Sequence, residues 1–287
     1  MIALVAGFLT ALCWTGTTLT SARASRLMGA SSTLAIVVLT GLLVSVPFAI
    51  LDLPPPGALT PAVIVTLLVA GAGNVLGLQL LYRGYREGLV AIVSAISSTE
   101  GAIAAVLAIL FGEAVSPGVG VALAVVVIGV VLAAFAGVDP SEHPIEGGSA
   151  QRGLAYAAAA AVAFGVGLYA VGAAANELPI AWAVLPARVV GVAVVALPLV
   201  ASGRLRLDRV GLPWAIADGL LEVAGIATFA IGAREAIAVT SVLATQFVAM
   251  TALVAWFLFG EKPTRLQRVG VGTVAIGVAV LSAVRAG

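Results

Sequence analysis

The sequence predicts an all-α integral membrane protein whose ten transmembrane helices form two inverted five-helix repeats. Three observations carry this prediction: the composition, a series of long apolar segments, and an internal repeat. Of the 287 residues, 62% are hydrophobic and only 9% are charged, and the mean hydropathy is +1.19. Soluble domains carry about 25% charged residues. The composition therefore excludes a water-soluble fold and indicates a chain that lies mostly within a lipid bilayer.

The internal repeat relates two stretches of equal length. Residues 84–113 read GYREGLVAIVSAISSTEGAIAAVLAILFGE, and residues 232–261 read GAREAIAVTSVLATQFVAMTALVAWFLFGE, at a constant shift of 148 positions without a gap. Gly, Arg, Glu and Phe all stay in register, which composition bias alone does not explain. We therefore predict two similar halves, residues 1–136 and 153–287, joined by a linker at 137–152.

Ten apolar segments fit the roughly 20 residues that a helix needs to cross a bilayer. The segment at the N-terminus lacks the basic region of a signal peptide, so we expect it to be a retained first span. Short connections rich in Pro and Gly leave no room for a soluble domain. The predicted spans are 2–21, 32–51, 61–82, 88–111 and 116–136, followed by 153–173, 179–201, 209–232, 236–259 and 264–284.

The number of spans in each half has a topological consequence. Five is odd, so if both halves share one fold, the second lies upside down in the bilayer, and a substrate site is expected between the halves at the midplane. Eleven of the 14 Lys and Arg residues fall in loops after the first, third, fifth, seventh and ninth spans. The positive-inside rule then predicts a cell-membrane protein with both termini on the non-cytoplasmic side.

Four ionisable residues fall deep within predicted spans, where a charge is costly and most often functional. Arg188 is the expected counter-ion of Glu222, either in a charged binding pocket or as a buried ion pair that fixes packing. Asp218 lies four positions before Glu222, on the same helix face but nearer the membrane surface. Pro186 should kink the helix beside Arg188, which favours the pocket. The fourth ionisable residue is Glu100.

Glu100 lies in the fourth span and has no Lys or Arg in that span or the one before it. An unpaired acid in so apolar a setting is a candidate proton carrier; the alternative is a protonated acid that is hydrogen-bonded to a hydroxyl. Ser97 and Ser98 precede it and align with Thr245 and Gln246 in the repeat. Polar residues at the middle of both spans predict that both helices line one cavity, so Ser97, Ser98 and Gln246 are candidate substrate contacts.

Other polar and aromatic positions extend this predicted cavity. Asn74 in the third span aligns with Glu222 in the eighth. Trp14 in the first span is either an aromatic wall of the cavity or a packing residue. We expect the first, third, fourth, sixth, eighth and ninth spans to surround the cavity. Gly73 and Gly77 form a small-residue pair that is typical of close helix packing.

The ends of the repeat have a structural interpretation. Both copies end in Leu-Phe-Gly-Glu, which places Glu113 and Glu261 just ahead of the next span. Because a helix N-terminus carries partial positive charge, we expect each glutamate to cap the span that follows it.

These features resemble the drug/metabolite transporter superfamily, specifically its EamA-type ten-helix members. The resemblance rests on the paired five-span repeats, on LLYRGYREGLVAIVSAISS, on LFGE at 110–113 and 258–261, and on ALCWTGTTLTSARASR at 11–26. It implies export of amino acids, drugs, sugars or other metabolites. The family usually has Pro near the middle of spans four and nine, where this chain has SST at 97–99 and TQF at 245–247. Many members also have cytoplasmic termini, whereas the charge distribution here predicts the reverse.

We expect a secondary active transporter, an exporter of a small polar or amphipathic metabolite such as an amino acid, with proton coupling through Glu100. Arg188 would engage a carboxylate, and Glu222 with Asp218 an amine. The alternative is a flippase of lipids or isoprenoid carriers. No enzyme activity, cofactor or metal site is predicted, because the chain has one Cys, one His and no catalytic motif. The expected partners are a small-molecule substrate, the lipid bilayer and protons, with no nucleic acid, for a monomer or homodimer.

Overall fold

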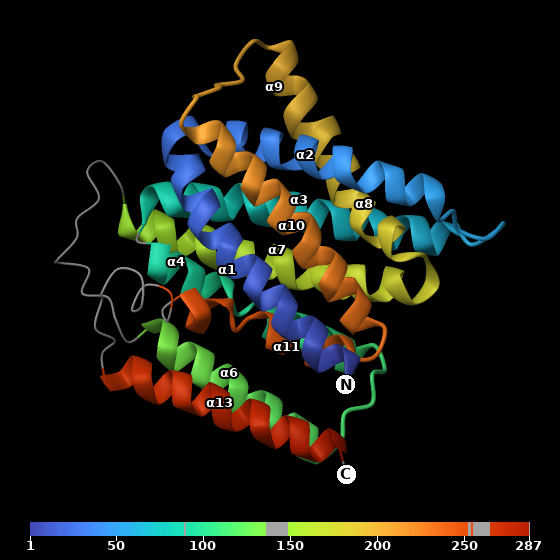
Figure 1. The fold of residues 1–287 in the computed structure, drawn as a ribbon, viewed down its shortest axis with the longest axis vertical. Coiled ribbons are helices and arrows are strands. Elements are labelled where there is room, and N and C mark those ends of the chain that lie inside the picture. The colour runs from blue at the N-terminus through green and yellow to red at the C-terminus, as the bar shows by residue number, and fades with distance from the viewer. Residues whose placement is uncertain (89, 136–148, 252–253, 255–264, 287) are drawn as a thin grey trace.

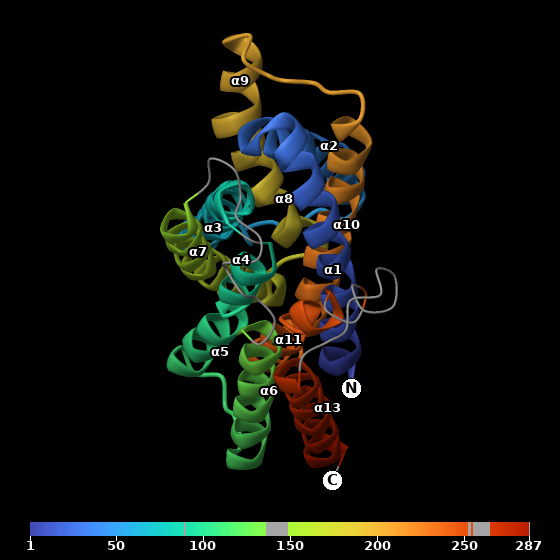
Figure 2. The same ribbon diagram turned by 90° about the vertical axis from the view of Figure 1, so that its left-hand side faces the viewer.

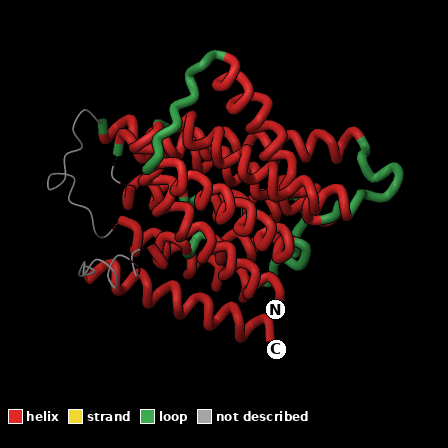
Figure 3. The backbone as a smooth tube through the Cα atoms, turned by 45° about the horizontal axis from the view of Figure 1, so that its top comes forward, coloured by secondary structure: helices red, strands yellow, loops and turns green. Residues whose placement is uncertain are grey.

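The computed structural model describes residues 1–88, 90–135, 149–251, 254 and 265–286. Most of the predicted linker and the second Leu-Phe-Gly-Glu copy, with Glu261, lie outside the described residues. Within the described ranges the secondary structure is helical, without any strand. Figure 3 shows the helices filling the bundle, with connections running mainly at its periphery. The prediction of an all-α protein is therefore confirmed.

The helices follow the apolar segments closely. The first half contains α1 (Ile2–Met28), α2 (Ala30–Leu51), α3 (Pro61–Glu87), α4 (Val90–Ser97), α5 (Glu100–Leu110) and α6 (Pro117–Phe135). The second half contains α7 (Ala150–Glu177), α8 (Ile180–Gly191), the π-helix η1 (Val192–Ala196), α9 (Leu197–Ala201), α10 (Gly211–Ala233), α11 (Ile237–Ala244) and α13 (Arg265–Ala286).

Seven helical segments in the described part are long and apolar enough to cross a membrane, and three further apolar helices are shorter. The seven begin at positions 2, 30, 61, 92, 151, 180 and 211, and the shorter ones at 117, 237 and 268. A backbone in lipid must satisfy its hydrogen bonds internally, which is why apolar segments of this length become helices. The structure therefore supports a multi-pass membrane protein, while the number of ten spans stays a prediction.

The helices pack in pairs drawn from different halves of the chain. The most extensive contacts join α3 to α7, α1 to α10 and α6 to α13. Figures 1 and 2 agree that α6 and α13 lie side by side at one end of the molecule, away from α9 at the opposite end. The core consequently forms between the halves and not within each half separately.

The α3–α7 contact is close because small residues meet there. A Cβ atom on Gly73 would lie 2.7 Å from the Cα of Gly167, and one on Gly77 would lie 2.5 Å from the ring of Phe164. Any larger side chain would push the two helices apart. The packing role predicted for Gly73 and Gly77 is thus confirmed.

Two spans that we predicted to be continuous are broken. The predicted span 88–111 is divided into α4 and α5 by a turn at Ser98 and Thr99. In the ninth span α11 ends at Ala244, a turn covers Thr245 and Gln246, and helix resumes over 247–251. Under the 148-residue shift the turn at 98–99 corresponds to 246–247, so the two turns differ in position by one residue.

Hydroxyl side chains bond to the backbone at both breaks. The side chains of Ser97, Ser98 and Thr99 donate to the carbonyl oxygens three residues earlier, at 3.1, 2.7 and 2.8 Å. Thr245 does the same to Val242, at 2.8 Å. A Ser or Thr hydroxyl that bonds a nearby carbonyl competes with the regular helix ladder. The sequence prediction counted only apolar length and so missed this local competition.

Helix α8 lies in the predicted seventh span, where we expected a kink at Pro186. It remains helical through that residue to Gly191. Regular α geometry gives way instead over η1, where Leu197 N–H bonds to the carbonyl of Val192, five residues back. Pro198 follows directly and cannot donate to the ladder. The irregular turn therefore lies just beyond Arg188, and not before it.

Glu113 also has a different role from the one predicted. Its carboxylate accepts from the backbone N–H groups of Ile237, at 2.9 Å, and Ala238, at 3.1 Å. These groups belong to the first turn of α11, not to α6, which follows Glu113 in the chain. The first turn of a helix offers unpaired N–H groups and positive charge wherever it lies in space. Glu113 therefore caps a helix of the other half.

Candidate functional site

The central polar cluster forms where α3, α8 and α10 meet. Asn74 on α3 donates from Nδ2 to Oε1 of Glu222 on α10, at 2.8 Å. The two residues are 148 positions apart, so they are equivalent in the sequence repeat and contact each other directly. Arg188 Nη2 on α8 lies 3.5 Å from the same carboxylate oxygen. The predicted pairing of Arg188 with Glu222 is present, in a cluster built by both halves.

Arg188 is enclosed but incompletely paired. Its side chain is fully buried, and Gly41 on α2 makes room for it: a Cβ there would lie 2.6 Å from Arg188 Cδ. The 3.5 Å contact is an ion pair by distance, yet Nε, Nη1 and Nη2 all lack a hydrogen-bond partner among the described residues. Buried guanidinium groups ordinarily use their five donors. Arg188 therefore has unused capacity to bind an anion.

Asp218 belongs to a neighbouring cluster. The hydroxyl of Tyr82 on α3 donates to Asp218 Oδ2 at 2.7 Å, and Thr20 on α1 donates to Oδ1 at 3.5 Å. Asp218 is fully buried, but it is absent from the wall of the central cavity. Its hydrogen bonds with Tyr82 and Thr20 join α1, α3 and α10. The structure thus places Asp218 one turn from Glu222 and separates it from the cavity.

A central cavity of about 40 Å³ lies beside the Asn74–Glu222 contact. Each of the six spans expected to surround it contributes, which confirms that prediction. Five predicted site residues line it: Trp14, Asn74, Ser97, Glu100 and Glu222. The remaining wall consists of Thr17, Thr18, Leu78, Leu81, Tyr85, Phe164, Leu168, Ile226 and Phe247.

Glu100 faces the cavity directly after the helix break. It is the first residue of α5 and is 5% exposed. No hydrogen bond or ion pair joins its carboxylate to another residue in the part of the chain that the structure describes. The break that Ser98 and Thr99 create therefore leaves an acid at the N-terminal end of a helix, at the cavity wall.

Trp14 combines the two roles considered for it. Its ring stacks on Phe229 at a centroid distance of 6.3 Å and meets Phe247 edge-on at 6.2 Å, as packing residues do. It also lines the cavity, and its Nε1 donor is buried without a partner among the described residues. The cavity wall thus offers one unused indole N–H.

Ser98 and Gln246 are buried at the two breaks but do not line the cavity. Ser98 uses its hydroxyl to bond the carbonyl of Ala95. Both residues lie at the breaks in the helices. Of the three polar residues predicted here, only Ser97 reaches the cavity wall.

Sequence reasoning missed two tyrosines near the end of α3. Tyr82 bonds Asp218, and Tyr85 lines the cavity while its hydroxyl lies 3.0 Å from that of Ser94. Both are only 1% exposed. The available signal was their spacing in the YRGYRE segment, because residues three apart share a helix face.

The size of the central cavity bears on how it can work. A water occupies about 30 Å³ of liquid, so 40 Å³ accommodates very few molecules. Neither an amino acid nor a larger metabolite fits without movement of the walls. The central cavity in this structure is therefore too small to hold such a ligand.

Comparison with known proteins agrees with this architecture. The EamA-like transporter family model matches residues 1–135. A solved crystal structure, described only as that of a protein, aligns with 98% of this chain and 96% of its own length, at a TM-score of 0.74 and 17% identity. This likeness extends over both halves, and at that identity it shows the fold alone. No curated protein matches the chain.

The family match covers the half of the chain that contributes Trp14, Asn74, Ser97 and Glu100 to the cavity. It agrees with the helical membrane architecture and with the motifs at 11–26, 80–98 and 110–113. This match places the first part of the chain, residues 1–135, with the EamA-like transporter family.

Proposed function

We propose that the protein is a secondary active transporter that exports a small polar or amphipathic metabolite, such as an amino acid, by alternating access between two five-helix halves. One observation carries the proposal: Asn74, Glu222 and Arg188 meet at the junction of the halves, beside a cavity that two broken helices border. Discontinuous helices and intramembrane charges at a repeat interface are features of transporter substrate sites.

Contacts between equivalent residues support an inverted repeat of residues 1–136 and 153–287, with ten spans in all. A Cβ on Gly129 would lie 2.6 Å from the backbone N of Val274, and one on Gly277 would lie 3.0 Å from that of Val126. The shift of 148 converts one contact into the other. Asn74 and Glu222 are likewise equivalent and touch each other, as residues near a two-fold axis do.

The cluster suits a zwitterionic substrate. Arg188 does not line the central cavity as it stands, but it contacts Glu222, which does. Its N–H donors have no partner among the described residues, and its planar fork matches carboxylate geometry. Glu222 offers negative charge for an amine, and Asn74 Oδ1 is a buried acceptor without a partner among the described residues. Trp14 and Ser97 would line the walls around the substrate. In this proposal Asp218 acts through Tyr82 and α10, whereas Ser98 and Gln246 act through the helix breaks.

The test of substrate chemistry is a thermal-shift screen of the purified protein against amino acids, sugars and organic acids, because a ligand stabilises the state that binds it. We expect amino acids to stabilise the protein. Arg188→Lys keeps the charge but removes the fork, and it should weaken the apparent affinity about tenfold or more. If no amino acid stabilises the protein while another class does, the zwitterion assignment is wrong.

Glu100 is the proposed proton carrier, because it is an acid at the cavity wall that has no partner among the described residues. In proteoliposomes, Glu100→Gln should abolish the dependence of amino-acid uptake on an imposed pH gradient while exchange of labelled for unlabelled substrate continues. Glu177→Gln, which neutralises an exposed acid at the end of α7, is the matched control. Gradient dependence that survives in Glu100→Gln would exclude this role.

A second pocket favours the alternative, a flippase of lipids or isoprenoid carriers. It measures about 350 Å³ between α2, α8 and α10, and its lining is mainly apolar. Phe48 and Leu51 border it and are 62% and 83% exposed. Val223, next to Glu222 in sequence, forms part of its wall, so an apolar chain there would lie close to the polar cluster. Scrambling of a labelled lipid, without transport of any soluble metabolite, would favour this alternative.

The orientation follows from charge. The Lys and Arg bias supports a cell-membrane protein with both termini on the non-cytoplasmic side. A topology reporter fused after Gly287 tests this, and a cytoplasmic signal there would reverse the assignment.

A further inference from the structure

We propose that a second site, a basic cleft at one end of the bundle, binds a phosphate-bearing anion. The basic cleft is an open hollow of about 680 Å³ that four arginines line: Arg83, Arg86, Arg204 and Arg206. It lies apart from the central cavity, with which it shares no lining residue. The proposal does not depend on which substrate the central cavity takes.

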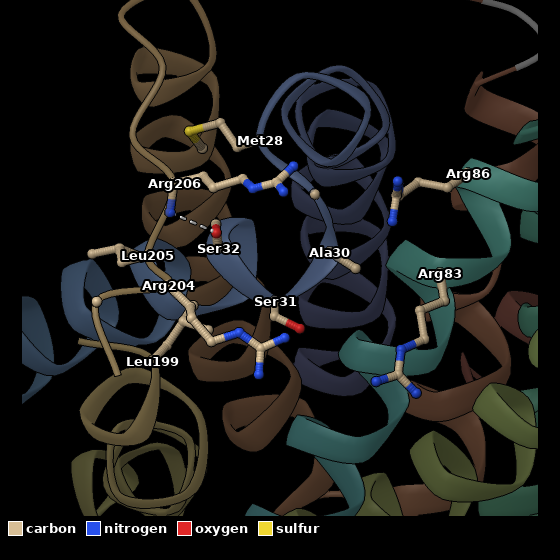
Figure 4. Close-up of a pocket in the computed structure, with 12 residues that line it drawn as sticks. Met28, Ala30, Ser31, Ser32, Arg83, Arg86, Leu199, Arg204, Leu205 and Arg206 are labelled. Atoms are coloured by element: carbon tan, nitrogen blue, oxygen red, sulfur yellow. Dashed lines mark hydrogen bonds between the residues drawn. The ribbon is translucent and has the colours of Figure 1, made fainter. Parts of the chain in front are cut away.

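The four arginines come from two separate parts of the chain. Arg83 and Arg86 lie near the end of α3, and Arg204 and Arg206 lie in the segment between α9 and α10. Figure 4 shows the two pairs extending their guanidinium groups from opposite walls, with the start of α2 between them. None of the four forms an ion pair with any residue that the structure describes. Gathering like charges is unfavourable, and a bound anion would offset their mutual repulsion.

Neighbouring carboxylates are engaged elsewhere. Glu87 follows Arg86 directly, but its Oε2 lies 3.2 Å from the guanidinium of Arg152. Asp208 lies two positions after Arg206, and its Oδ2 accepts from the backbone N–H groups of Val210 and Gly211 at 2.9 and 2.6 Å. The acids nearest in sequence therefore do not neutralise the cleft.

The floor of the cleft is the N-terminus of α2, a helix of 22 residues whose N-cap, Gly29, provides no side-chain cap. Its first N–H groups, at Ala30, Ser31 and Ser32, lack partners within the helix and carry partial positive charge. The Ser32 hydroxyl accepts from the backbone N–H of Arg206 at 3.0 Å, which holds the Arg206 segment against this helix end. Helix terminus and arginines thus favour the same kind of ligand.

A phosphate group fits these donors best. Guanidinium forks bind phosphate oxygens in pairs, and helix N-termini bind phosphate through backbone N–H groups. The hollow is larger than a phosphate ion, and Met28, Leu199 and Leu205 give it apolar edges. An anionic phospholipid headgroup with its glycerol would use both features, whereas a free phosphate would use only the first.

The basic cleft also joins the two halves. Its lining belongs to α2 and α3 of the first half and to α9 and the α9–α10 connection of the second. A bound anion would hold these ends together and so stabilise the conformation described here.

A simpler explanation is that the arginines only mark the cytoplasmic side of the membrane. In that case any two arginines on this side would be equivalent. The test therefore compares Arg83→Gln/Arg204→Gln, which removes one charge from each wall, with Arg23→Gln/Arg209→Gln, which removes two exposed charges outside the cleft.

The full chain, purified in a non-ionic detergent, is titrated with inorganic phosphate, short-chain phosphatidylglycerol or short-chain phosphatidylcholine while its thermal unfolding midpoint is measured. We expect phosphatidylglycerol to raise the midpoint. Its apparent Kd should rise about tenfold for each arginine removed from the cleft and stay unchanged in the control pair. Inorganic phosphate that binds as tightly as phosphatidylglycerol identifies a soluble ligand; much weaker phosphate binding identifies the lipid headgroup.

Either result supports an anion site. Three results would overturn it: no shift with phosphate or phosphatidylglycerol, equal shifts with the zwitterionic phosphatidylcholine, or an equal loss of binding in the control pair. Each leaves the proposed transport function standing, because that function depends on the central cavity.

Discussion

Asn74 in the first half and Glu222 in the second occupy the same position of the sequence repeat and contact each other, yet one is neutral and the other acidic. The same contrast recurs around them. Arg188 aligns with Thr40, and Glu100 aligns with Val248. Some glycines at helix contacts, in contrast, align with glycines, as Gly77 does with Gly225 and Gly129 with Gly277. The halves thus share part of their packing and differ in the charges that lie within the spans.

The breaks in the fourth and ninth spans show the same division. Hydroxyl-to-carbonyl hydrogen bonds occur at both breaks, at Ser98 and at Thr245, where the family resemblance leads one to expect proline. Only the first break places an acid, Glu100, at the cavity wall. A shared backbone feature therefore carries different side chains in the two halves.

The largest expected effect is a difference in stability loss between variants of Glu222 and variants of Asn74. Glu222→Leu would leave Arg188 buried without its ionic partner, and removing one member of a buried pair costs about 3–5 kcal/mol. Asn74→Leu removes a neutral donor and should cost about 1–3 kcal/mol. Unfolding of the purified variants in detergent measures both. Adding Arg188→Met to Glu222→Leu should recover stability; equal losses in the two single variants would contradict the asymmetry.

A smaller effect tests the symmetry of the α6–α13 contact. Gly129→Ala and Gly277→Ala each place a methyl group against the opposite helix, and overpacking typically costs about 1–3 kcal/mol. Gly272 in α13 has open space around its Cα, so Gly272→Ala should be neutral or should stabilise by up to about 1 kcal/mol. Thermal unfolding of the three variants compares them. A loss confined to one of the two contact glycines would argue against equivalent halves.

The smallest effect concerns the helix breaks. Ser98→Ala and Thr245→Ala each remove one hydroxyl bond worth about 0.5–1.5 kcal/mol and let the carbonyl ladder continue. Amide hydrogen exchange should slow at residues 98–100 and 245–246, because the turns become more helical. Thr251→Ala serves as the control, since its hydroxyl bonds Phe247 within regular helix. Unchanged exchange at both turns would mean that tertiary packing, not the hydroxyls, holds them open.

Much of the site could be predicted because charges inside apolar segments are conspicuous. Glu100, Glu222 and Arg188 stood out for that reason, and the Arg188–Glu222 contact followed from the expectation that their two spans, joined by a short loop, are neighbours. Asp218 shows the limit of this reasoning. Its hydrogen-bond partner is the hydroxyl of Tyr82, a side chain that looks like ordinary helix packing in the sequence and lies 136 positions away.

The prediction for Glu113 was wrong because its carboxylate caps a helix that is distant in the sequence. Glu113 was assigned to the next helix along the chain, because capping is usually local. In the folded chain its carboxylate instead accepts from N–H groups of α11, 124 positions away in sequence. Packing of α5 against α11 brings these ends together, and no local pattern records that arrangement.

The sequence by itself determined that the chain is helical and belongs in a membrane, because apolar segments in lipid must satisfy their hydrogen bonds within each segment. It also marked the residues whose charge is too costly to be incidental. Only the tertiary structure decided which of them face one cavity, that Arg188 keeps unused donors, and that four arginines converge in the basic cleft. These outcomes depend on contacts between helices far apart in the chain, whose energies arise only when the halves pack together.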